Sequence, residues 1–101
     1  MLSLLYTTVS SSEEAQTLAR GILEGKLAAC VNISSPLSSL YVWEGKVEEA
    51  TEYSLLIKTS SAKGLALKEW LLANHPYDIP AILMWSAETT EGFGSYVRMS
   101  L

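Results

Sequence analysis

Apolar positions along the chain change their spacing from strand-like to helix-like and back. The first run, Leu2–Val9, is apolar on both alternating sides and rich in β-branched and aromatic residues, which predicts a buried strand. Ser10 and Ser11 each stand three residues before a glutamate, which is the spacing of a helix capping box. The apolar residues of this predicted helix form one stripe, namely Ala15, Leu18, Ala19, Ile22 and Leu23. We expect Gly25 to end the helix in a left-handed conformation.

The middle of the chain predicts a short strand and then a long hairpin. The run 27–33, LAACVNI, is too short for a helix and should form a strand that ends in a bend near Pro36. From residue 40 to residue 59 polar and apolar residues alternate, and Glu44-Gly45 is the turn signal between the two arms. This hairpin is long compared with ordinary strands, so its outer end is a candidate for pairing with a neighbouring chain.

A second helix is predicted after the hairpin. Ser60 and Ser61 are expected to cap it, and it should run to about Asn74. Its inward stripe is expected to consist of Leu67, Trp70 and Leu71. Pro76 disfavours the helical conformation at His75 and therefore marks the end of the helix.

The last segments complete an α+β fold. The run 81–87, AILMWSA, predicts a strand, and a loop with Gly92 and Gly94 precedes a short helix in residues 95–101. The order β-α-β-β-α-β is that of the ferredoxin-like split βαβ fold, with both helices on one face of an antiparallel sheet and a single domain over residues 1–101. No segment is left for the other face, although its strands are apolar. We therefore expect another subunit to cover that face.

Composition narrows the class of protein. The chain has 101 residues, of which 49% are apolar, and a net charge of −4 from seven basic and eleven acidic side chains. The basic residues are scattered singly, which disfavours nucleic-acid binding. The amino terminus lacks a basic segment and a long apolar run, so we expect neither a signal peptide nor a membrane partner. The single cysteine fits a reducing compartment, which favours a cytoplasmic location.

Four phrases, LAACVNI, SSLYVWEGKVEE, LLIKT and HPYDIP, occur in an order that resembles the CutA family of divalent-cation tolerance proteins. The resemblance extends from about Leu5 to Tyr96. It implies a ferredoxin-like homotrimer, similar in architecture to PII-type signalling proteins, that is linked to tolerance of copper and other divalent metals. Two positions depart from the family pattern: Ala81 stands where a glutamate is typical, and Met99 stands where a tryptophan is typical.

Cys30 and His75 are the metal-ligand candidates that the resemblance implies. A thiolate is a soft ligand that suits Cu(I), and imidazole is a favoured ligand for copper and zinc. Each residue also has a purely structural interpretation: Cys30 as a small core residue, and His75 as the end of a helix. Two donors are too few for a closed tetrahedral site, so we expect weak metal binding and no permanently bound cofactor.

A cleft between subunits is the second candidate site. Glu52 and Lys58 share one face of the long hairpin arm, because six residues separate them. The residues expected to line the cleft are Tyr41, Trp43, Glu52, Lys58 and Tyr77, with His75 nearby. In such a cleft a small anion could be held by charge and aromatic walls. The alternative for Lys58 is a solvated strand end.

Three hypotheses for function follow. The first is a trimeric, cytoplasmic CutA-like protein of divalent-metal tolerance, which binds copper weakly through Cys30 and His75. The second is a PII-like signalling or scaffold module that binds a small metabolite in the inter-subunit cleft. The third is a trimeric adaptor without a small ligand. We expect no enzyme, because the sequence has no phosphate loop, no paired carboxylates and no nucleophile with an evident base.

Overall fold

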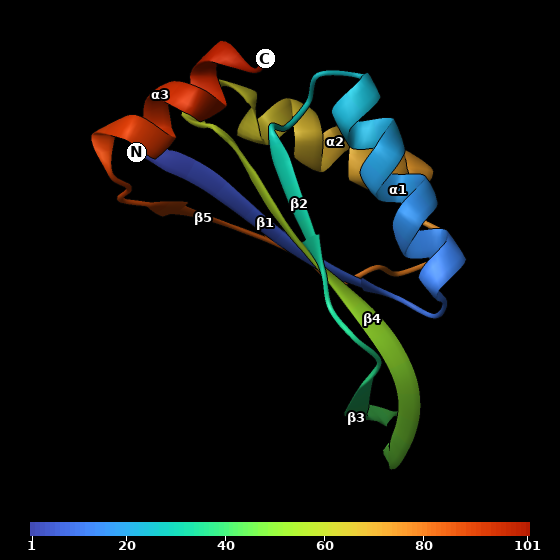
Figure 1. Cartoon of the computed structure of the whole chain (residues 1–101). Coiled ribbons are helices and arrows are strands. Elements are labelled where there is room, and N and C mark those ends of the chain that lie inside the picture. Colours follow the sequence, from blue (N-terminus) through green and yellow to red (C-terminus); the bar gives the residue numbers. More distant parts are fainter.

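A computed structural model describes all residues from 1 to 101 and shows an α+β fold built on one antiparallel sheet (Figure 1). The strands are β1 (Leu2–Val9), β2 (Cys30–Ile33), β3 (Leu37–Trp43), β4 (Lys46–Ser60) and β5 (Ile82–Ala87). The helices are α1 (Ser12–Glu24), α2 (Gly64–Asn74) and α3 (Glu91–Met99), with a single 3₁₀ turn at Ser61–Lys63 before α2. None of the helices is long and apolar enough to cross a membrane.

The strand order confirms the predicted ferredoxin-like arrangement. The sheet runs β2-β4-β1-β5, and every neighbouring pair is antiparallel. β4 is long enough to pair with β1 and β2 over its second half and with β3 over its first half. The first arm of the hairpin begins at Leu37, three residues earlier than the alternation indicates. β4 therefore joins the compact part of the fold to the projecting hairpin.

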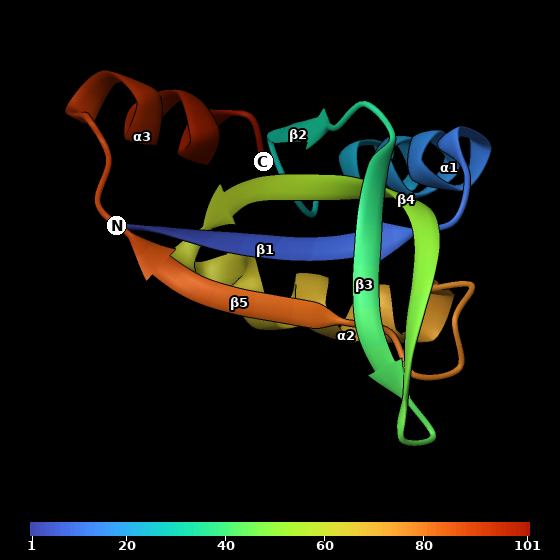
Figure 2. The ribbon, with the colours of Figure 1, turned by 90° about the horizontal axis from the view of Figure 1, so that it is seen from below.

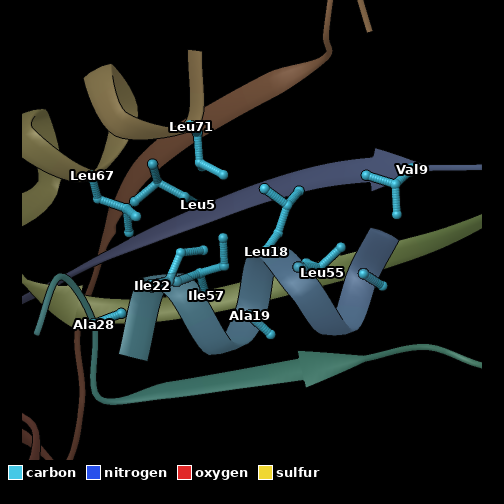
Figure 3. Close-up of a cluster of buried hydrophobic side chains, with 11 residues drawn as sticks. Leu5, Val9, Leu18, Ala19, Ile22, Ala28, Leu55, Ile57, Leu67 and Leu71 are labelled. Atoms are coloured by element: carbon cyan, nitrogen blue, oxygen red, sulfur yellow. The ribbon is translucent and has the colours of Figure 1, made fainter. Parts of the chain in front are cut away.

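One face of the sheet carries α1 and α2, and the hydrophobic core lies between the sheet and these two helices (Figures 1 and 3). Apolar side chains of β1 and β4 pack there against the stripes of both helices. The buried cluster consists of Leu5, Val9, Ala15, Leu18, Ala19, Ile22, Ala28, Leu55, Ile57, Leu67 and Leu71. Trp70 is only half-buried, and Leu23, expected in the stripe of α1, is 39% exposed. The predicted inward faces of both helices are otherwise confirmed.

The opposite face of the sheet is open in this chain, as predicted. Figure 2 shows β1, β4 and β5 from this side with α2 behind them. Tyr6 is paired with Leu56 on one side and with Leu83 on the other. Leu83 and Trp85 remain 57% and 44% exposed. A row of apolar side chains that crosses three strands is therefore left without cover.

The β3–β4 hairpin extends away from the compact part of the fold (Figure 1). Its turn has positive φ at Glu44 (51°) and Gly45 (77°), which is the type I′ geometry that suits a two-residue hairpin. In Figure 2 the hairpin runs crosswise to β1 and β5. The longest dimension of the molecule is 44 Å, compared with 24 Å for the other two. Large apolar side chains on this arm are exposed, including Val42 and Val47 at 72% each.

The ends of α1 agree with the capping prediction only in part. The Ser11 hydroxyl accepts a hydrogen bond from the Glu14 amide at 3.1 Å, as a capping box requires. The Glu14 carboxylate reaches back to the amide and hydroxyl of Ser10. At the other end the prediction for Gly25 is wrong, because its φ is −79° and the left-handed residue is Lys26 with φ 57°. The Gly25 amide bonds the Gly21 carbonyl, so the helix turn closes there without a positive φ.

The start of α2 also differs from the prediction. Neither Ser60 nor Ser61 caps the helix, because a 3₁₀ turn intervenes and the Ser61 hydroxyl donates to the Met1 carbonyl. The end of the helix is as predicted. His75 adopts an extended conformation before Pro76, with φ −71° and ψ 139°, and its amide donates to the Leu71 carbonyl at 2.9 Å.

Two further segments depart from their predicted bounds. Of the predicted strand 27–33, only Cys30–Ile33 is a strand, and the residues before Cys30 belong to the connection from α1. The loop predicted around Gly92 and Gly94 belongs to α3, which begins at Glu91. Gly94 is buried, and a Cβ there would lie 3.1 Å from the Thr89 side chain, so close packing explains this glycine. The short terminal helix is therefore longer than predicted.

Candidate functional site

A pocket of about 640 Å³ lies where the hairpin meets the end of β1 and the segment that follows α2. Its lining residues come from these three places, and they are Thr8, Ser39, Tyr41, Trp43, Ala50, Glu52, Tyr77, Asp78, Ile79 and Ala81. A shallower depression of about 580 Å³ near the start of α3 is lined by only four residues. The pocket at the hairpin is therefore the better candidate for a ligand site.

Two of the lining residues, Tyr77 and Glu52, are joined by a hydrogen bond. The Tyr77 hydroxyl donates to Glu52 Oε2 at 2.7 Å. Burial raises the pKa of Glu52, but hydrogen bonds from Ser39, Tyr77 and Thr8 outweigh this effect, so the pKa lies below its usual value. Burial, followed by the bond to Glu52, raises the pKa of Tyr77 far above its usual value. At neutral pH the pair is therefore a carboxylate held by a protonated phenol.

His75 stands beside the pocket, and its ring is fully hydrogen-bonded within the chain. Nε2 lies 3.0 Å from the Thr8 carbonyl oxygen and 2.9 Å from Thr7 Oγ1, and Nδ1 accepts the Tyr77 amide at 3.1 Å. Because Nδ1 accepts, the proton of the neutral ring is assigned to Nε2, which donates to the Thr8 carbonyl. Burial lowers the pKa of His75 below its usual value. The ring therefore ties α2 to β1 as a neutral group.

Cys30 and Lys58 form a separate cluster on the open face of the sheet. They are paired residues of β2 and β4, and Lys58 Nζ lies 3.8 Å from Cys30 Sγ. Lys58 also donates to the Asn32 side chain. Cys30 is partly buried and not in a disulfide. Its immediate neighbour is therefore an ammonium group and not a second metal donor.

The structure brings together four of the five residues expected in the cleft. Tyr41, Trp43, Glu52 and Tyr77 line the pocket, whereas Lys58 does not. Glu52 and Lys58 do share one face of β4, but six residues of extended strand span about 20 Å. Within one chain Lys58 therefore lies with Cys30 and outside the pocket, and its place in a cleft between subunits stays a prediction.

Several lining residues were not foreseen from the sequence. Ser39 occupies the same face of β3 as Tyr41 and Trp43, so strict alternation backwards from the two aromatic residues would have found it. Thr8 enters only through tertiary structure, because it lies at the end of β1. Ala81, the position that departs from the CutA pattern, also faces the pocket. That departure therefore changes the lining itself.

The two predicted metal donors do not fit a shared metal site within one chain. Cys30 pairs with Lys58, which lies opposite Leu4 of β1, whereas His75 bonds to Thr7 and Thr8 further along that strand. Both His75 nitrogens already have partners, so no lone pair is free for a metal ion. No group of three His, Cys, Asp or Glu side chains gathers anywhere in the chain. A metal ion bound by both residues would require a second subunit and a rearranged imidazole.

Taken together, the fold and the site define a small α+β protein with a ferredoxin-like sheet, an open apolar face and an aromatic pocket at the base of a projecting hairpin. The sequence profile of the CutA1 divalent ion tolerance proteins matches residues 3–100. The chain belongs to this family.

Relatives with known structures share the fold over nearly all of this chain. The divalent ion tolerance protein CutA1 of Ehrlichia chaffeensis is 36% identical with a TM-score of 0.93, covering 98% of this chain and 94% of that one. The periplasmic divalent cation tolerance protein CutA of Archaeoglobus fulgidus is 38% identical with a TM-score of 0.92, covering 99% and 98%. A CutA homolog of Xenopus laevis is 45% identical over 82 residues, which are 81% of this chain but only 54% of that protein. The chain thus matches about half the length of the vertebrate relative.

Proposed function

We propose that this protein contributes to divalent-cation tolerance as a homotrimeric binding protein without catalytic activity. The observation that carries the tolerance role is the family match over residues 3–100. Trimerisation is supported by the open face of the sheet, where Leu83 and Trp85 are largely exposed beside Tyr6 and Leu56. Contiguous apolar surface of this kind marks an interaction site in soluble proteins.

Light scattering with size-exclusion chromatography tests the trimer. The wild type should elute with the mass of three chains. Leu83→Glu places a charge on the open face and should give a folded monomer, because an unpaired charge in an apolar interface is costly. Leu72→Glu is the matched control, since Leu72 is 62% exposed on α2, away from that face, and this variant should stay trimeric. A monomeric wild type at micromolar concentration would remove the trimer from the proposal.

Metal binding in this proposal is weak, with copper as the metal and Cys30 and His75 as the donors to be tested. Cys30 is the stronger candidate, because a thiolate suits Cu(I) and the side chain is partly accessible. His75 would first have to give up its bonds to Thr8 and Tyr77. Metal binding by Cys30 therefore leaves the bonds of His75 to Thr8 and Tyr77 intact, whereas metal binding by His75 would break them.

Anaerobic calorimetry with Cu(I) and Cu(II) tests these roles in wild type, Cys30→Ser and His75→Ala. We expect Cys30→Ser to lose Cu(I) binding and His75→Ala to retain it. Equal affinities in all three proteins would exclude both residues as donors. A large loss in His75→Ala alone would contradict the assignment of its ring to structure.

A cytoplasmic location belongs to the same proposal. It is supported by one unpaired cysteine, which suits a reducing compartment. The Archaeoglobus relative is described as periplasmic, so a periplasmic location is the alternative to a cytoplasmic one. Fractionation of native cells followed by immunodetection distinguishes them, and recovery outside the cytoplasm would contradict this part.

A second candidate function is that of a PII-like module that binds a small metabolite in the pocket. The specific observation in its favour is the pocket of about 640 Å³, into which Tyr41, Trp43, Glu52 and Tyr77 converge. Pockets of this size with a few placed polar groups are typical of small-molecule sites. A thermal-shift screen with nucleotides, carboxylates and amines tests it. The absence of any stabilising compound other than metal ions would contradict it.

A further inference from the structure

The chemistry of the pocket is selective in charge. Three aromatic side chains line it, those of Tyr41, Trp43 and Tyr77. Two carboxylates also line it, Glu52 and Asp78, and no lysine, arginine or histidine does. An anionic ligand would thus meet two carboxylates and electron-rich aromatic rings without any cationic side chain to balance its charge; the hydroxyl groups of Thr8 and Ser39 are the neutral polar groups of the lining. The lining favours a cation.

Glu52 is built into the pocket as a fixed anion. Tyr77 donates to Oε2 at 2.7 Å, which orients the carboxylate. Glu52 is partly buried, so its charge is screened less than that of a carboxylate free in water. The hydrogen bonds that lower its pKa also keep it ionised at neutral pH. A charge of known position and sign therefore stands next to the aromatic walls.

The kind of cation follows from what the pocket lacks. The pocket holds two carboxylates but no group of three acidic, histidine or cysteine side chains, so it does not offer a metal ion a full set of protein ligands. An organic ammonium, in contrast, needs one anion and the faces of aromatic rings, which attract a cation through the ring quadrupole. The volume of about 640 Å³ exceeds that of a single metal ion and suits an organic molecule.

We propose that this pocket binds a small organic ammonium ion, with its cationic head against Glu52 and between the rings of Tyr41, Trp43 and Tyr77. The inference rests on the second candidate function, that the pocket holds a small molecule. It replaces the small anion expected from the sequence, because Lys58 lies outside the pocket. Ala81 makes its part of the lining small and apolar, which gives room for alkyl groups on the nitrogen.

Calorimetry with two matched probes tests the proposal on the full chain. Choline carries a trimethylammonium head. Its uncharged isostere, in which carbon replaces the nitrogen, is 3,3-dimethyl-1-butanol (dimethylbutanol). Choline should bind at least about tenfold more tightly than dimethylbutanol, since the attraction of carboxylate and rings acts only on the charge. Glu52→Gln and Trp43→Leu should each weaken choline binding about fivefold or more. Glu49→Gln removes the same charge from the opposite face of β4 and should leave binding unchanged.

The outcomes separate the ligand class from the pocket itself. Equal binding of choline and dimethylbutanol would keep the pocket as a small-molecule site but overturn the ammonium. Binding of a carboxylate or nucleotide in place of choline would overturn the ammonium in the same way. No binding of any of these compounds would overturn the second candidate function as well. If choline fails to bind and Glu52→Gln weakens self-association in light scattering, a second copy of the chain occupies the pocket, and the small-molecule proposal is wrong.

Discussion

His75→Ala separates a structural histidine from a metal ligand. The substitution removes the ring that bonds Thr7, Thr8 and Tyr77, while the helix end is retained by Pro76. Thr7 is fully buried, so its hydroxyl loses a partner in a place that water does not easily reach. A buried polar group without a partner costs about 1–3 kcal/mol, and water can replace the ring at the half-buried positions. We therefore expect the free energy of unfolding to fall by about 2–4 kcal/mol.

Urea unfolding at one fixed protein concentration measures this loss, because subunit association contributes to the apparent stability. Asn74→Ala is the control: it lies one residue earlier, and its exposed amide bonds only the Trp70 carbonyl. It should change stability by less than about 0.5 kcal/mol. A loss below about 0.5 kcal/mol for His75→Ala would refute the structural role derived from the three contacts. Unchanged Cu(I) affinity in the same variant would complete the separation.

Three further predictions concern pH, packing and capping. Burial lowers the pKa of His75 below its unfolded value of 6.5. The contribution of His75 to the free energy of unfolding is therefore fully present above about pH 6.5 and falls as the pH drops towards the folded pKa. Urea midpoints should decrease from pH 7.5 to pH 5 in the wild type and decrease less in His75→Ala. Gly64→Ala would place a Cβ 2.7 Å from Ser3 Oγ and should cost about 1–3 kcal/mol. Gly92→Ala in α3, where the space is open, should gain up to about 1 kcal/mol, and thermal melts of both glycine variants measure the two effects. Ser11→Ala removes the cap of α1 and should cost about 1 kcal/mol, seen as a lower urea midpoint, whereas a similar loss in Ser12→Ala would contradict the assignment of the cap.

The fold was largely predictable because its signals are local. The apolar run of β1, the capping box of α1 and the Glu44-Gly45 turn each depend on a few adjacent residues. The errors occur where tertiary packing decides. Gly94 permits a close approach inside α3 and does not break it. Ser61 bonds the Met1 carbonyl, a partner sixty residues away in sequence, and so is not available as a cap.

The site was predictable as a set of residue types but not as a set of neighbours. The alternation of residues correctly placed Glu52 and Lys58 on one face of β4. The pattern does not say, however, whether two residues on the same face are close enough to share a site. The length of β4 separates them into two environments, a pocket with Tyr77 and a cluster with Cys30. The partners of His75 were equally hidden, because β1 and the end of α2 meet only in the folded chain.

The central place of β4 has a kinetic consequence. β1 and β2 do not pair with each other, and both use β4 as their partner. Leu2 meets Ser60, so this pairing closes a loop that spans more than half of the chain. Closing such loops costs chain entropy before the contacts compensate it, which slows folding. The hairpin of β3 and β4 is the most local pairing of the sheet, and we expect it to form before β1 can dock. The arm that projects furthest in the native molecule would then be the earliest ordered part of its sheet.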